Sequence, residues 1–148
     1  MGDNLADLVT ATPPSAFTRL DLSLCRALTR LIIPVWLRKP GIVVDTIFPT
    51  INSSQLAYVQ LNSEDDPNYC PQIDYQSWAI ADHHLQRLAK LFSSEHPGEK
   101  MEVMVSEYHW AGPPTDEFVE RLGSEKFLPG LKEEAKFRLG SAIDCFGT

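Results

Sequence analysis

The feature that most constrains the fold of this chain is an alternation of strand-like and helix-like segments between residues 55 and 139. Short apolar runs suited to strands occupy Gln55–Leu61, Met101–Val105 and Lys136–Leu139, and helical patterns occupy Trp78–Phe92 and Thr115–Leu122. Strands that alternate with helices form parallel sheets, in which the helices are the crossover connections. The sequence therefore predicts an α/β fold with a mostly parallel sheet.

The segment Trp78–Phe92 carries the clearest helical pattern. Its apolar residues are spaced by three or four positions, which is the spacing of one helix face: Trp78, Ala81, Leu85, Leu88 and Phe92. Asp74 or Ser77 can cap the start of this helix, and His96-Pro97-Gly98 is typical of a helix end. We expect the apolar stripe to pack on a sheet in which Leu56–Leu61 and Met101–Val105 are parallel neighbours.

The first third of the chain has weaker patterns. Alternating leucines at Leu20, Leu22 and Leu24 predict a half-buried strand. Apolar residues at helical spacing in Gly41–Ile51 predict a helix that ends just before Pro49. The sequence predicts a flexible N-terminal tail at residues 1–15, a single α/β domain at residues 16–143 and a C-terminal tail at residues 144–148.

Composition narrows the classes of function. The net charge is −7, which argues against a nucleic-acid-binding surface, because such a surface needs clustered Lys and Arg. The three cysteines, Cys25, Cys70 and Cys145, are widely spaced, which predicts free thiols in a reducing compartment. The most apolar run, Leu31–Leu37, is too short to span a bilayer, and the acidic N-terminus does not look like a signal peptide. We expect an acidic, intracellular protein of the cytoplasm or nucleus, with no membrane association.

No motif in the sequence predicts catalysis. In Asp82-His83-His84 the two histidines are adjacent in a helix, so their side chains point about 100° apart and cannot share one metal as an i, i+4 pair can. We interpret this cluster as a solvated helix face. Cys70 and Cys145 lack the sequence context of a nucleophile, and no glycine-rich phosphate loop is present. The sequence predicts no catalytic residue, no metal and no cofactor.

Two segments are candidate binding sites. Tyr108, His109 and Trp110 follow a predicted strand, at the end of a parallel sheet where ligands bind in open α/β folds. These side chains either cover the edge of the sheet or form a recognition loop. The other segment is Phe17–Leu37, which is more apolar than one edge element can hide. It predicts an exposed patch from Ile32 to Leu37, with Trp36 and Leu37 contacting a protein partner or a second copy of the chain.

Five segments carry a resemblance to a known family: Val44–Ser53, Gln55–Leu61, Trp78–Ala89, Met101–Val105 and Phe127–Glu133. In their order and apolar spacing, over roughly residues 43 to 140, they resemble the C-terminal leucine-rich-repeat-like part of the F-box/LRR-type proteins of mushroom-forming fungi. The resemblance implies a short leucine-rich-repeat-like array that recognises another protein. Nothing before Pro34 resembles the F-box, so it implies the recognition half without the half that docks on a ubiquitin-ligase adaptor.

Two hypotheses of function follow. The favoured one is a non-enzymatic protein-interaction module, similar to the substrate-recognition part of F-box/LRR proteins. The alternative is an α+β, cone-like single domain that acts as a small isomerase-like enzyme or small-molecule binder, with a pocket near Tyr108–Trp110 and a contribution from Cys70 or His84. Such a pocket would hold a titratable group with a perturbed pKa among apolar walls.

Overall fold

The computed structural model describes residues 7–9, 22–23, 25–41, 43–63, 73–107 and 116–141. Its strands are β1 (Asp7–Val9), β2 (Arg30–Val35), β3 (Tyr58–Ser63), β4 (Glu102–Glu107) and β5 (Lys136–Ser141). Its helices are the π-helix η2 (Val43–Ile47), the 3₁₀ helix η3 (Phe48–Thr50), and α1 (Tyr75–Glu95), α2 (Asp116–Leu122) and α3 (Pro129–Glu134).

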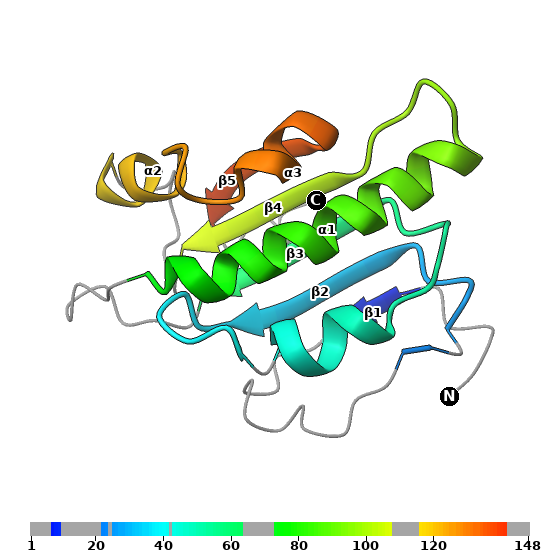
Figure 1. Ribbon diagram of the computed structural model, residues 1–148, viewed down its shortest axis with the longest axis horizontal. Coiled ribbons are helices and arrows are strands. Elements are labelled where there is room, and N and C mark those ends of the chain that lie inside the picture. The colour runs from blue at the N-terminus through cyan, green and yellow to red at the C-terminus, as the bar shows by residue number, and fades with distance from the viewer. Residues whose placement is uncertain are drawn as a thin grey trace.

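The strands form one sheet whose spatial order is the order of the sequence, β1-β2-β3-β4-β5, and all four strand pairs are parallel. Helices η2, α1 and α3 lie on the same side of this sheet (Figure 1). The α/β prediction is therefore confirmed, and so is the parallel pairing of β3 with β4, in which Leu61 lies opposite Val105. The all-parallel sheet excludes the α+β alternative for the described residues.

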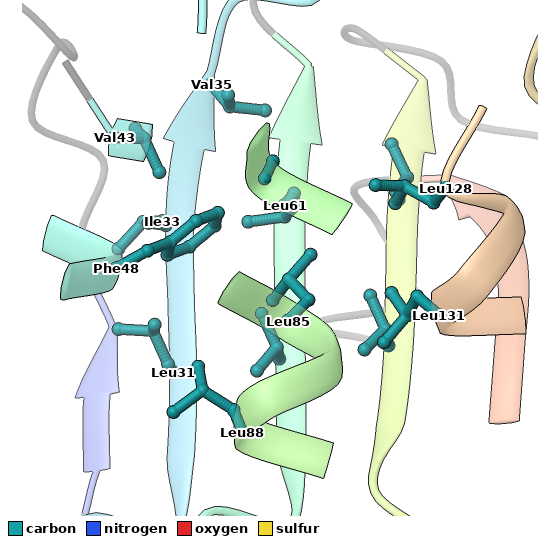
Figure 2. Packing of buried hydrophobic residues seen from close by; sticks show 14 of the residues in the cluster. Leu31, Ile33, Val35, Val43, Phe48, Leu61, Leu85, Leu88, Leu128 and Leu131 are labelled. Carbon is teal, nitrogen blue, oxygen red and sulfur yellow. The ribbon is translucent and has the colours of Figure 1, made fainter. Parts of the chain in front are cut away.

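The hydrophobic core lies between the helices and the face of the sheet that they cover. Alternate strand residues point to this face, among them Leu31, Ile33, Val59, Leu61, Val103 and Val105, and all of these are buried. Helix α1 buries the five residues of its predicted stripe against them, so that prediction is confirmed. Figure 2 shows Leu85 and Leu88 of α1 over the face of the sheet, with Phe48 on one side and Leu131 on the other.

The ends of α1 also agree with the sequence. The Asp74 carboxylate accepts hydrogen bonds from the Ser77 N–H at 3.2 Å and from the Ser77 hydroxyl at 2.7 Å, so Asp74 is the N-cap. The C-cap is His96, and Gly98 follows with a φ of +85°, a conformation that favours glycine. Both ends are therefore fixed by local side chains that the sequence makes visible.

The first third of the chain departs from the prediction. Leu22 is buried but lies outside every strand, whereas the strand of this region is β2. Pro34 sits inside β2. In a sequence, a proline within an apolar run argues against predicting a strand there. The Thr29 carbonyl accepts from the Tyr58 N–H, so alternation places the Pro34 nitrogen on the opposite edge, facing β1. Pairing with β1 ends at Ile32, so Pro34 removes no hydrogen bond from the sheet.

Two further segments differ in detail. The predicted helix Gly41–Ile51 forms as η2 followed by η3, and its apolar residues are buried as the spacing predicts: Val43, Val44, Ile47, Phe48 and Ile51. Pro49 lies in the first turn of η3, where its missing N–H is not needed, rather than beyond the end of the helix. Asp7–Val9, inside the predicted tail, form strand β1.

The predicted exposed patch from Ile32 to Leu37 is wrong. Ile32, Ile33 and Val35 are at most 1% exposed, and Ile33 and Val35 belong to the hydrophobic core beneath the helices. Leu37 is 5% exposed and belongs to the core, and its carbonyl accepts a hydrogen bond of 2.8 Å from the indole Nε1 of Trp78. Trp36 is partly exposed. The prediction of self-association depended on this apolar surface, and most of that surface is buried within the chain.

Asp82, which the sequence places on a solvated face, is 7% exposed and holds α3 against α1. Its carboxylate accepts hydrogen bonds from the Leu131 N–H at 2.8 Å and from the Gly130 N–H at 3.1 Å. These N–H groups belong to the first turn of α3, whose own N-cap residue Leu128 makes no side-chain cap bond. A Cβ at Gly130 would collide with the Gln86 side chain, which itself bonds Asp82. The solvated interpretation is wrong for Asp82.

Two cationic side chains donate hydrogen bonds to backbone carbonyls at the ends of helices, as Asp82 accepts them from N–H groups at the start of α3. The Arg87 guanidinium donates to the carbonyls of Phe48 and Ile51, each at 3.2 Å, and so joins α1 to η3. The Lys132 ammonium donates to the carbonyls of Leu122 and Ser124, both at 2.8 Å, and so joins α3 to the end of α2. Burial lowers the pKa of Lys132, with the Asp82 charge acting in the opposite direction. These contacts complement the partial negative charge of helix ends.

Candidate interaction surface

The face of the sheet that carries no described helix is here called the second face. The register of the strands aligns its residues in three rows, and each row runs across β2, β3, β4 and β5. The rows are Arg30, Tyr58, Glu102 and Lys136; then Ile32, Gln60, Met104 and Arg138; then Pro34, Asn62, Ser106 and Gly140. The second face is therefore mainly polar, in contrast to the aliphatic face beneath the helices.

A chain of hydrogen bonds runs along β3 on the second face. The Tyr58 hydroxyl donates to Oε1 of Gln60 at 2.6 Å, and Nε2 of Gln60 donates to Oδ1 of Asn62 at 2.8 Å. The Ser106 hydroxyl donates to the same Asn62 oxygen at 2.6 Å, which ties β4 to β3. Gln60 and Ser106 are buried, and a fully bonded network of this kind fixes the side chains that belong to it.

The exposed part of the second face is the row at its amino-terminal end together with Arg138. Arg30, Tyr58 and Glu102 are partly exposed, and Lys136 and Arg138 are exposed. The Arg30 guanidinium lies 5.8 Å from the centre of the Tyr58 ring, and Nε of Arg138 lies 2.9 Å from Oε2 of Glu102. We call these five residues the charged row. It combines an aromatic ring, held in place by Gln60, with three cations and one anion.

A groove of about 640 Å³ adjoins the charged row at the amino-terminal ends of the strands. Its lining comes from residues that precede the strands, from the end of α1 and from the loop that follows α1: Thr29, Gln55, Ala57, Phe92, His96, Gly98, Glu99, Lys100 and Lys136. Lys136 belongs to both the groove and the charged row. We call this hollow the amino-edge groove.

Of the five residues that the sequence singles out for binding, Trp36 and Leu37 are among the described residues, and neither belongs to the charged row or lines the groove. Tyr108, His109 and Trp110 lie outside the described residues, and the strand before them, β4, ends at Glu107. Trp36 also follows a carboxyl end, that of β2. The charged row is at the opposite end of the same strands. Leu37 is in the core and is unavailable to a partner.

The histidines of α1 belong to no group of metal ligands among the residues that the structure describes. The ring centres of His83 and His84 are 6.3 Å apart, and the described residues contain no group of three or more His, Cys, Asp or Glu side chains placed to hold a metal. Burial, then the charges of Arg87 and His83, lowers the pKa of His84. Cys25 is buried, as expected of a core thiol, whereas Cys70 and Cys145 lie outside the described residues.

Sequence reasoning missed the charged row because none of its members is distinctive alone. The only signal is that Arg30, Tyr58, Glu102 and Lys136 are each the first residue of their strand. The register of the sheet places these four residues side by side. The sequence predicts where each strand begins only to within a few residues, so it does not predict this alignment.

Comparison with known proteins finds no relative of this chain: no family model matches it, and no characterised protein or solved structure matches it. Within the described part of the chain, no helix is both long enough and apolar enough to cross a bilayer.

Proposed function

We propose that this chain is a non-enzymatic protein-interaction module, built as a short leucine-rich-repeat-like array and resembling the substrate-recognition part of F-box/LRR proteins. The observation that carries the proposal is the arrangement of the sheet. Parallel strands follow one another in sequence order, and helices η2, α1 and α3 between them lie on one face. Right-handed crossovers between successive neighbours give this one-sided arrangement, which is the arrangement of repeat arrays.

On the second face Ile32, Gln60, Met104 and Ser106 are at most 1% exposed, so the charged row is the part of that face that we propose a partner contacts. Its Arg138–Glu102 ion pair has side chains that are 49% and 35% exposed. Exposed pairs of this kind contribute about 0–1 kcal/mol, so a partner can exchange them for its own contacts at little cost. The charged row contains Tyr58 and two arginines, and tyrosine and arginine are among the residue types most enriched at the centres of protein interfaces. A cytoplasmic or nuclear location belongs to the same proposal.

The enzyme alternative draws no support from the described residues. It requires a titratable group among apolar walls near Tyr108–Trp110, and that segment lies outside them. The pKa of His84 is perturbed, but His84 lies on α1, on the helix side of the sheet.

Affinity capture from an extract of the source organism, with quantitative mass spectrometry, tests the proposal. The row variant Arg30→Ser/Arg138→Ser removes two cations from the charged row. The control Arg26→Ser/Lys90→Ser removes two cations from exposed positions elsewhere, so both variants change the net charge equally. At least one protein should be captured by the wild type and the control and be depleted about tenfold by the row variant, which corresponds to about 1.4 kcal/mol.

Thermal denaturation of all three proteins establishes that the row variant is folded. If wild type, row variant and control capture the same proteins in equal amounts, the charged row is not a recognition surface. If the control loses partners as completely as the row variant does, capture reflects overall charge, and the proposal fails in the same way.

A further inference from the structure

The amino-edge groove has one apolar wall and a charged rim. Phe92 is 6% exposed, and its ring stacks on the imidazole of His96, with the ring centres 4.3 Å apart and the planes at 17°. The His96 ring is held by Nδ1, which lies 3.0 Å from the Phe92 carbonyl oxygen. A volume of about 640 Å³ lies within the range of roughly 300–1,000 Å³ found for binding sites.

Three backbone carbonyls at the base of the groove are engaged in hydrogen bonds of the sheet. The Thr29 carbonyl accepts from the Ala57 N–H at 2.9 Å, the Ala57 carbonyl accepts from the Glu102 N–H at 2.8 Å, and the Met101 carbonyl accepts from the Lys136 N–H at 2.9 Å. The side chains of the rim are exposed, and they include charged groups that can select a ligand.

Two lysines dominate that rim. Lys100 and Lys136 are exposed, and neither ammonium group has an ion-pair partner among the residues that the structure describes. The Glu99 carboxylate is the single anion in the lining. Because the whole chain carries a net charge of −7, a groove with two lysines and one glutamate is a local reversal of sign. Charge complementarity at such a place selects an anionic ligand.

We propose that the amino-edge groove binds an acidic segment of the partner protein, with its carboxylates on Lys100 and Lys136 and its apolar atoms against Phe92 and His96. The inference rests on the proposed function, since it names the chemistry of the segment that the module receives. Lys136 links the groove to the charged row, so one extended segment can cross both. A long nucleic acid does not suit the site, because the net negative charge of the chain repels it.

Fluorescence anisotropy of a fluorescein-labelled hexaglutamate peptide, with hexaglutamine as the neutral control, tests the inference. Hexaglutamate should bind saturably and more weakly at high salt, and hexaglutamine should not bind. The variant Lys100→Glu/Lys136→Gln should weaken binding by about fivefold or more, since it removes two exposed attractions and adds a repulsion. Lys100→Arg/Lys136→Arg should retain the affinity. Lys90→Glu, at an exposed position on α1, should leave it unchanged.

Three results would overturn the inference. One is the absence of saturable hexaglutamate binding, and another is an equal loss of affinity in Lys90→Glu. The third is full displacement of the peptide by succinate or by an oligothymidylate at a lower concentration than unlabelled hexaglutamate, which would assign the groove to a small dicarboxylate or to nucleic acid. Partner capture through Arg30 and Arg138 is measured independently, so it can persist when peptide binding fails.

Discussion

Replacing Asp82 by alanine should loosen α3 from the rest of the protein. The substitution leaves the N–H groups of Gly130 and Leu131 without their acceptor at a position that is 7% exposed in the folded chain. Loss of a helix N-cap costs about 0.5–2 kcal/mol, and leaving a buried donor unsatisfied costs about 1–3 kcal/mol. Because the two costs describe overlapping contacts, they do not add in full, and we expect a decrease of about 1–3 kcal/mol in the free energy of unfolding.

Urea unfolding followed by tryptophan fluorescence measures this decrease. Trp78 is a suitable reporter because its ring centre lies 4.9 Å from the ring centre of Phe127, which precedes α3. Glu120→Ala is the matched control, since it removes the same charge from an exposed position on α2 and should change stability by less than about 0.5 kcal/mol. Asp82→Asn should fall between the wild type and Asp82→Ala, because Gly130 and Leu131 bond different oxygens of Asp82 and a carboxamide keeps an acceptor oxygen at only one of these two positions. If Asp82→Ala is as stable as Glu120→Ala, the carboxylate does not hold α3.

Four further outcomes are expected. Leu85→Ala removes a fully buried side chain and should lower the free energy of unfolding by about 2–5 kcal/mol in the same urea assay; a loss below about 1 kcal/mol would contradict its place in the core. The Ser77 hydroxyl and then the Ser77 N–H lower the pKa of Asp74, so its stabilisation is present above pH 3.8 and is lost as pH falls through the folded pKa. The stability difference between wild type and Asp74→Ala should therefore vanish in strong acid, and a difference that persists there would refute the cap. Burial lowers the pKa of His84, so the unfolded chain binds the proton more readily and stability falls as pH drops below 6.5 towards the folded pKa. His84→Gln should be less acid-sensitive than the wild type in a pH series of thermal melts. Native and non-reducing mass spectrometry should show three free thiols and no bound ion, and a mass two units lower, or a stoichiometric zinc, would contradict this.

The sequence predicts the central and C-terminal part of the fold well because each element there has a strong local signal. Helix α1 shows its whole buried stripe in the spacing of apolar residues, and the ends of β3, β4 and β5 lie within three residues of their predicted positions. Strand β2 was missed because Pro34 contradicts a strand unless its nitrogen faces an unpaired edge, which is a property of the sheet rather than of the segment.

The candidate site was less predictable than the fold, since its residues come together only through register. Asp82 shows the same difficulty: its partners are 48 and 49 residues away, so nothing near it in the sequence indicates a cap. Arg87 likewise bonds carbonyls 36 and 39 residues away. A charged residue on the polar side of an amphipathic helix is usually solvated, and only tertiary structure identifies the exceptions.

The order of the strands determines how the molecule can be built and shortened. Every strand after β1 pairs with its immediate predecessor in the chain, so during synthesis each new strand finds its template already made. The same order makes the two kinds of truncation unequal. Removing β5 leaves the pairs of β1 to β4 intact, whereas removing β3 separates β2 from β4 and divides the sheet into two fragments of two strands.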